Sequence, residues 1–125
     1  MKNYTLGIYA KNSTTMRVPK DQLKILGAEK DKAIELPALA ILPSKAVCVV
    51  MDWLEDENVF LVDCDKRKIF TYNLVDQAHK PEKVGDILYI NPTTFEVTTE
   101  KKEIMLGPFV GIKGDSVLFH LTDGL

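Results

Sequence analysis

The chain has 125 residues, of which 46% are hydrophobic and 27% are charged, and its formal net charge is −2. This length and composition are typical of one globular domain, and they exclude a disordered, collagenous or disulfide-rich sequence. The longest apolar stretches are far shorter than the ~20 residues of a membrane-spanning helix, and the first residues lack the apolar segment of an export signal. We therefore expect a single domain with no membrane partner.

Basic charge is concentrated at the start of the chain. Residues 1–20 carry four cations and no acidic side chain, the cations being Lys2, Lys11, Arg17 and Lys20. Nucleic-acid binding depends on clustered cations that neutralise several phosphates, and four dispersed side chains do not provide such a cluster. The charge pattern therefore does not favour a nucleic-acid partner.

The first expected element is a strand over residues 3–10. Alternate positions along it are apolar and share one face of a half-buried strand, these positions being Tyr4, Leu6, Ile8 and Ala10. The polar residues 12–15 have no periodicity and indicate a loop or a mobile arm. Pro19 is suited to open a short helix that runs through Leu26. Residues 34–43 contain Pro37 and Pro43, which favour an edge or extended segment.

Seven short apolar segments separated by turn residues follow, at 46–53, 59–63, 68–74, 86–90, 95–99, 106–112 and 116–121. This spacing is typical of a compact antiparallel barrel or sandwich. The sequence therefore predicts a mainly β fold with at most one or two short helices. It comprises an N-terminal strand or arm over residues 1–18 and a single antiparallel β-barrel or sandwich-like domain over residues 19–125.

The two cysteines, Cys48 and Cys64, lie in apolar segments on either side of a polar hairpin loop at residues 54–58. If Trp53 pairs with Val59, Cys48 lies opposite Cys64, close enough for the two side chains to touch. We expect both thiols to be reduced in a cytoplasmic protein.

Residue patterns for catalysis or metal binding are missing from the sequence. His79 and His120 are isolated, and no activated serine or cysteine motif is present. His120 lies in an apolar terminal segment, which favours a partly buried imidazole with a hydrogen-bond partner. We expect no catalytic residue, no cofactor and no metal site. An enzyme would require Asp52, Asp63 or Asp65 to converge with one of the histidines.

The C-terminal third carries a resemblance to a known family. It contains, in order, a Gly-Asp-x-hydrophobic-Tyr strand at 85–89, a Val-Thr-Thr strand at 97–99 and a Leu-Gly-x-x-hydrophobic strand at 106–110, before a final strand. This pattern resembles the small phage capsid cement or decoration proteins. Residues 68–74 fit the strand that precedes the pattern, the first 45 residues show no match, and Pro108 departs from the family pattern.

The resemblance implies a structural, non-enzymatic protein that is made in the host cytoplasm and binds the outside of an assembled phage capsid. Its partner would be the lattice of the major capsid protein, and proteins of the family commonly form trimers at local three-fold positions. Such a protein reinforces the shell through many weak contacts, so it needs no deep pocket.

The N-terminal segment is the best candidate for docking on the capsid. It combines an alternating apolar strand with cations, so it is suited to add a strand to a partner's sheet edge and to meet an acidic surface. The candidate docking residues are Lys2, Tyr4, Leu6, Ile8, Lys11 and Arg17. In the alternative arrangement, the strand completes the protein's own sheet and the charges are solvated.

Two other functions remain open from the sequence. One is another structural subunit of a virion or appendage. The other is a small β-barrel that binds a ligand or a nucleic acid, with aromatic side chains stacking on bases beside Lys66, Arg67 and Lys68. The aromatic residues available for stacking are Phe70, Tyr72, Tyr89 and Phe95.

Overall fold

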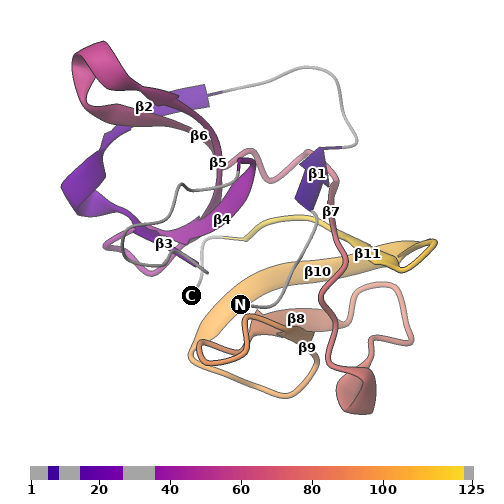
Figure 1. The fold of residues 1–125 in the computed structure, drawn as a ribbon. Helices are drawn as coiled ribbons and strands as arrows, with labels where there is room; N and C mark the ends of the chain where they lie inside the picture. The colour runs from indigo at the N-terminus through magenta and orange to yellow at the C-terminus, as the bar shows by residue number, and fades with distance from the viewer. Residues whose placement is uncertain (1–5, 9–14, 27–35, 123–125) are drawn as a thin grey trace.

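The computed structural model describes residues 6–8, 15–26 and 36–122, and it consists of two antiparallel β-sheets (Figure 1). The six-stranded sheet has the order β1-β7-β11-β10-β8-β9, and the five-stranded sheet has the order β2-β6-β5-β4-β3. The first five strands are β1 (Leu6–Ile8), β2 (Thr15–Pro19), β3 (Lys24–Ile25), β4 (Ala38–Ile41) and β5 (Val47–Leu54). The others are β6 (Val59–Asp63), β7 (Phe70–Tyr72), β8 (Ile87–Ile90), β9 (Val97–Thr98), β10 (Ile104–Lys113) and β11 (Ser116–Phe119).

The predicted mainly β fold is confirmed. Both sheets are open, so the fold is sandwich-like, without a closed barrel among the described residues. Helical structure in the described ranges is confined to 3₁₀ turns at Lys20–Gln22, Glu55–Glu57 and Gln77–His79. No helix in the described part of the chain has the length and apolar character needed to cross a membrane.

Each of the seven predicted apolar segments coincides with one strand, β5 to β11 in chain order. Strand β6 has the predicted bounds, and β5 starts and ends one residue later than predicted. The hairpin between them turns at Asn58, which adopts a left-handed conformation with φ 55° and ψ 40°. Asparagine tolerates this conformation better than most residues, so the local sequence determines the turn.

The predicted helix from Pro19 to Leu26 is wrong beyond its first turn. The chain leaves the 3₁₀ turn at Leu23, which is extended, and then forms β3, which pairs with β4. The backbone N–H of Leu26 donates to the carbonyl oxygen of Leu39 at 2.9 Å, and the Leu26 side chain is buried. Sheet pairing and burial of Leu26 therefore outweigh a weak local preference for helix.

Of the two alternatives expected for residues 34–43, an edge or an extended segment, the described residues 36–43 show the extended one, because strand β4 lies inside the five-stranded sheet between β3 and β5. Pro37 precedes the strand and Pro43 follows it, so neither removes a hydrogen-bond donor from within the ladder. A loop or arm is expected at residues 12–15, but Thr15 is the first residue of strand β2. Residues 12–14 lie outside the described ranges.

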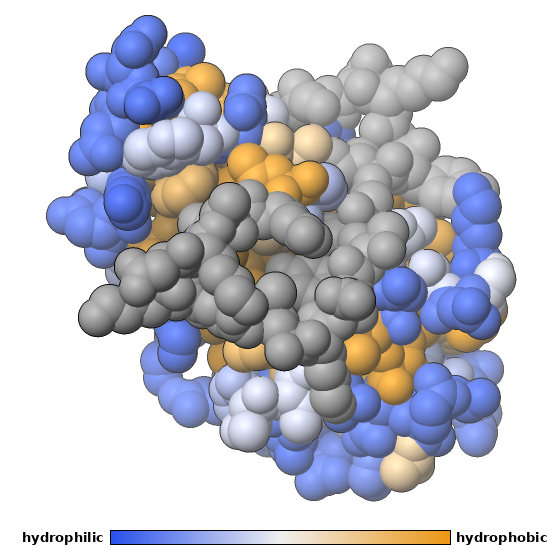
Figure 2. All heavy atoms as spheres, viewed as in Figure 1, coloured by the Kyte–Doolittle hydropathy of each residue, from blue (hydrophilic) through white to orange (hydrophobic). Residues whose placement is uncertain are grey.

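The central strands of the five-stranded sheet, β4 and β5, are buried on both faces over residues 38–40 and 47–50. Leu39, Val47 and Val49 belong to the main core, which they share with the six-stranded sheet. Cys48 and Val50 point to the opposite face and form a second core within the curl of the sheet visible in Figure 1. A strand covered on both faces has a continuous apolar sequence, which explains the unbroken run at residues 46–51. Figure 2 shows hydrophilic residues along the outer margin of this part of the molecule.

A buried ion pair lies where the chain passes from one sheet to the other. The Lys68 ammonium Nζ is 2.6 Å from Asp63 Oδ2, and the side chains are only 5% and 0% exposed. The other Asp63 oxygen accepts a hydrogen bond from the Asp65 N–H at 3.0 Å. The His120 ring Nδ1 lies 2.8 Å from the Lys68 carbonyl oxygen, which gives this partly buried imidazole the partner expected from the sequence. These contacts fix the end of β6 to the segment that precedes β7.

Candidate functional site

The candidate docking residues of the N-terminal segment are divided between the two sheets. Leu6 and Ile8 lie in β1, at the edge of the six-stranded sheet, opposite Tyr72 and Phe70 of β7. Arg17 lies in β2, at the edge of the five-stranded sheet, and its exposed Nε is 3.2 Å from Glu57 Oε1. Lys2, Tyr4 and Lys11 lie outside the described residues. Within the described segments, one side of each strand is therefore paired with the protein's own sheet.

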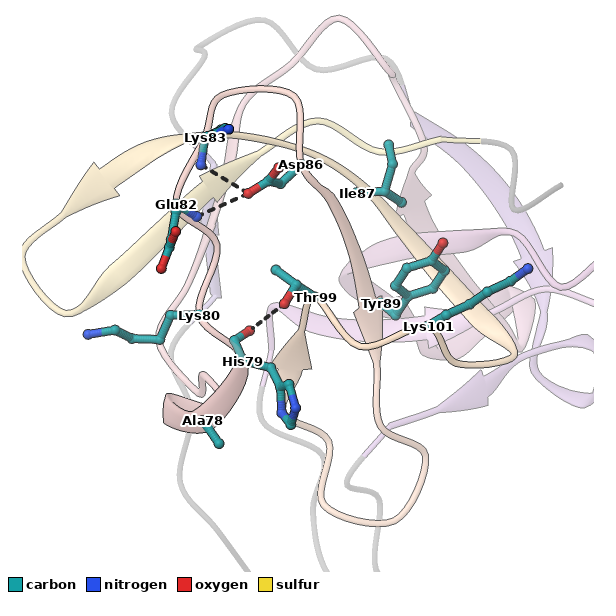
Figure 3. A pocket seen from close by; sticks show the side chains of 10 residues that line it. All are labelled: Ala78, His79, Lys80, Glu82, Lys83, Asp86, Ile87, Tyr89, Thr99 and Lys101. Atoms are coloured by element: carbon teal, nitrogen blue, oxygen red, sulfur yellow. Dashed lines mark hydrogen bonds between the residues drawn. The ribbon is translucent and has the colours of Figure 1, made fainter.

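A hollow of about 630 Å³ lies beside strand β8, and we call it the β8 hollow (Figure 3). It is bounded by the 3₁₀ turn at Gln77–His79, the loop over residues 80–86, strand β8 and residues 99–101. The lining residues are Ala78, His79, Lys80, Glu82, Lys83, Asp86, Ile87, Tyr89, Thr99 and Lys101.

The Gly-Asp pair of the family-like motif forms one wall of the β8 hollow. Gly85 has φ +97°, a conformation that favours glycine, and its N–H donates to the Phe109 carbonyl oxygen at 2.9 Å. Asp86 Oδ2 accepts hydrogen bonds from the backbone N–H groups of Lys83 at 2.9 Å and Glu82 at 3.1 Å. These two hydrogen bonds hold the pKa of the Asp86 carboxyl below its ordinary value of 3.8. The motif therefore shapes the turn that leads into β8.

A second wall is held by His79. Its Nδ1 is 2.9 Å from Asp76 Oδ2, its Nε2 is 3.3 Å from Glu100 Oε2, and its carbonyl oxygen accepts from the Thr99 hydroxyl at 3.0 Å. Asp76 also accepts from the Ala78 N–H at 3.1 Å. The His79 ring beside Asp76 lowers the pKa of that carboxyl. His79 therefore links the 3₁₀ turn to the segment that follows β9.

The rim of the β8 hollow carries three lysines and two acidic residues, Glu82 and Asp86, so it is net basic, and exposed apolar side chains form its lip. Lys80, Lys83 and Lys101 are exposed, and within the described residues their ammonium groups have no ion-pair partner. Val84 is 78% exposed and Ile87 is 40% exposed. The side chains of Lys80 and Lys101 extend in opposite directions away from the hollow (Figure 3). Such an arrangement suits a broad acidic protein surface better than a compact ligand, which needs converging groups.

This surface could not be predicted from the sequence because Lys101 is distant in the chain from Lys80 and Lys83. Pairing of β8 with β9, with Tyr89 opposite Thr98, brings residues 99–101 to the hollow that Lys80 and Lys83 also line.

The aromatic residues considered for base stacking are mostly part of the core. Phe70 and Tyr72 are fully buried, and the Tyr72 hydroxyl donates to the Phe95 carbonyl oxygen at 2.6 Å. Lys68 is in the buried ion pair, and Arg67 Nε is 3.1 Å from Asp65 Oδ1. Strand β7 and the turn before it therefore do not present the exposed aromatic and basic face that stacking requires.

The acidic residues and histidines that an enzyme would require do not converge on one site in the described part of the structure. Asp63 lies close to His120 only through Lys68, whose ammonium contacts the carboxylate and whose carbonyl contacts the ring. His79 has Asp76 and Glu100 as its partners instead. Across residues 6–8, 15–26 and 36–122, no group of three or more histidine, cysteine and acidic side chains is placed to hold a metal ion.

Replacing Asp86 by asparagine should lower the midpoint of thermal unfolding at pH 7 by a few degrees, because a neutral amide is a weaker acceptor for the two N–H groups. The folded-state pKa of Asp86 is lowered, so its stabilisation is present above the unfolded pKa and is lost as the pH falls through the folded pKa. The difference between wild type and Asp86→Asn should therefore close at acidic pH, in thermal melts recorded from pH 7 downward.

Asp115→Asn is the control for this titration. Asp115 lies in the exposed turn between β10 and β11, and its carboxylate accepts no hydrogen bond from the described residues. Its melting midpoint should follow that of the wild type at every pH. A difference for Asp86→Asn that stayed constant down to the lowest pH would contradict the assigned role of the Asp86 charge.

Comparison of the chain with protein-family models, with curated proteins and with solved structures gave no match in any of the three.

Proposed function

We propose that this chain is a structural virion protein that binds the outside of an assembled phage capsid lattice, as a trimer, and reinforces the shell. One observation supports the proposal above the others. Residues 84–121, which carry the resemblance to capsid decoration proteins, fold into the consecutive strands β8, β9, β10 and β11 of one sheet. The family-like motif thus corresponds to one continuous structural unit. If the short motifs matched by chance, they would not need to lie in the same sheet.

The β8 hollow is the docking surface that we propose for this function. Its apolar lip at Val84 and Ile87 beside a basic rim has the composition of a protein interface, with an apolar centre and a polar margin. The chain as a whole has a net charge of −2, so a local basic rim orients the protein toward an acidic partner surface. The N-terminal candidates Lys2, Tyr4, Leu6, Ile8, Lys11 and Arg17 are a second docking surface to be tested beside it.

Replacing Lys80, Lys83 and Lys101 together by glutamate should weaken attachment to the capsid about tenfold or more, because reversed charges at an interface repel the partner. The measurement is co-sedimentation of the purified chain with capsids of the virus that encodes it, at several salt concentrations. The affinity of the wild type should also fall as the ionic strength rises. Electron microscopy of saturated capsids should show the chain outside the shell, with three copies at each occupied site.

The matched control is the substitution of Lys20, Lys24 and Lys113 by glutamate, which changes the net charge equally on other exposed surfaces. If both triple variants bind like the wild type, the β8 hollow is not the docking surface, although the capsid function stands. If the wild-type chain neither occurs in purified particles nor binds capsids, the proposed function is wrong.

The three lysines also favour a second candidate function, which is binding of a polyanion such as a nucleic acid. Fluorescence anisotropy with single-stranded and double-stranded oligonucleotides separates the two functions. A salt-dependent affinity for oligonucleotides that the Lys80, Lys83 and Lys101 variant loses, without binding to capsids, would favour the nucleic-acid module.

A further inference from the structure

Cys48 and Cys64 face each other across the β5–β6 hairpin. Near the turn, Leu54 pairs with Val59 and Trp53 with Phe60, which is one residue away from the register expected from the sequence. A bulge between Val50 and Asp52 shifts the register back, so that Val50 pairs with Val62 and Val49 with Asp63. The next position along each chain therefore places Cys48 opposite Cys64, as the sequence predicted, although the predicted pairing of Trp53 with Val59 is wrong.

The two thiols differ in their surroundings. Cys48 is fully buried in the second core, whereas Cys64 is half-buried, so a reagent in solution reaches Cys64 first. Both cysteines are free. The side-chain hydrogen bond between the two thiols lowers the pKa of Cys64 and raises that of Cys48. Cys64 is thus the more nucleophilic and the more accessible of the two.

The backbone is already spaced for a bond between them. Directly opposite residues in an antiparallel pair have Cα atoms about 4.5 to 5.5 Å apart, and disulfides span about 4.4 to 6.8 Å. Joining Cys48 to Cys64 therefore requires rotation of side chains and no rearrangement of the two strands.

We propose that Cys48 and Cys64 form a disulfide by exchange with a small-molecule disulfide such as oxidised glutathione. The Cys64 thiolate attacks one sulfur of the small disulfide and releases one small thiolate, leaving a mixed disulfide on Cys64. Cys48 then loses its proton and attacks the Cys64 sulfur, and the second small thiolate leaves. The two protein thiols lose two electrons and two protons, and the small disulfide becomes two thiols. This chemistry does not depend on capsid binding.

Closing the bond has a mechanical consequence for the hairpin. It encloses residues 49–63 in a covalent loop and ties β5 to the residue that directly follows Asp63 of the buried ion pair. A loop of this size reduces the freedom of the unfolded chain, so oxidation should raise the midpoint of thermal unfolding by about 10 °C. The same protein would then exist in a more labile reduced form and a more resistant oxidised form.

The test is to titrate the full chain with oxidised glutathione and to follow intact mass, thiol alkylation and thermal unfolding. The wild type should lose two hydrogen atoms, become resistant to alkylation and melt at the higher temperature, and dithiothreitol should reverse all three changes. Cys48→Ala should stop at a glutathione adduct on Cys64. Cys64→Ala should stay unmodified while folded, because the remaining thiol is buried.

Three results would overturn the proposal. The wild type could remain alkylatable at high oxidised glutathione, or accumulate a stable adduct on Cys64 without an internal bond. Alternatively, folded Cys64→Ala could react at Cys48 as fast as Cys48→Ala reacts at Cys64. Melting curves of both variants before oxidation establish that each is folded, so a loss of reactivity is not mistaken for a loss of structure.

Discussion

Replacing Gly107 by alanine should destabilise the protein by about 3 kcal/mol or more. A Cβ at this position would lie 1.8 Å from the carbonyl oxygen and 2.8 Å from the carbonyl carbon of His120, and the glycine has φ +152°. Both atoms belong to the backbone of the segment that hydrogen-bonds to β10, where the N–H of His120 donates to the Pro108 carbonyl oxygen at 3.1 Å. The neighbour cannot move without breaking this pairing. Chemical denaturation monitored by circular dichroism measures the loss.

Gly111→Ala in the same strand is the matched control. A Cβ there would meet only the Leu118 side chain, at 3.9 Å, which is ordinary van der Waals contact. Alanine at this position should change the free energy of unfolding by less than about 1 kcal/mol. Equal effects of the two substitutions would mean that the close approach of residues 107 and 120 does not hold in solution.

Replacing Lys68 by methionine should cost about 3 to 5 kcal/mol of stability, because it leaves the fully buried Asp63 carboxylate without its counter-ion. Asp63→Asn should cost a similar amount, since it leaves a buried ammonium group instead. The double variant should lose much less than the sum of the two, because neither charge is then buried alone. Denaturant unfolding of the four proteins gives the coupling energy of the pair.

The exposed ion pair between Lys45 Nζ and Glu103 Oε1 serves as the control, because its 2.7 Å separation is nearly the same. Lys45→Met should leave the free energy of unfolding nearly unchanged, since water replaces the lost partner. If the two lysine substitutions had equal effects, or the Asp63 and Lys68 losses were additive, burial of the inter-sheet pair would not be what makes it strong.

Apart from β1 and β7, the strands that could be predicted from the sequence have a partner close in the chain. The hairpin of β5 and β6 has an apolar run on each side of a polar loop, and β10 and β11 are separated by a turn that contains Gly114. Strands β2 and β3 were not predicted from the sequence. Each pairs with a strand that is distant in sequence, and each exposes polar side chains. Their local sequence alone favours a loop or a helix.

The features of the candidate site were harder to predict than the fold. Lys68 follows two charged residues in a polar turn, so nothing local distinguishes a buried ammonium group from a solvated one. The β8 hollow is formed by segments distant in sequence, because pairing of β8 with β9 brings residues 99–101 to the loop that carries Lys80 and Lys83. Conversely, the opposition of Cys48 and Cys64 was predicted correctly because a one-residue error in the turn is offset by the bulge at Met51.

In the six-stranded sheet, some neighbouring strands are distant in sequence, so the sheet cannot form in the order in which its strands are synthesised. Strand β1 is the first to leave the ribosome, yet its neighbour is β7, and β7 in turn lies against β11, which ends at Phe119. Neither side of β7 is filled by a strand adjacent to it in sequence. Non-local pairings of this kind are formed slowly, since a long loop must close before any contact stabilises it. The six-stranded sheet is therefore completed only after β11 has been synthesised, and the side of β7 that pairs with β11 stays unpaired until then.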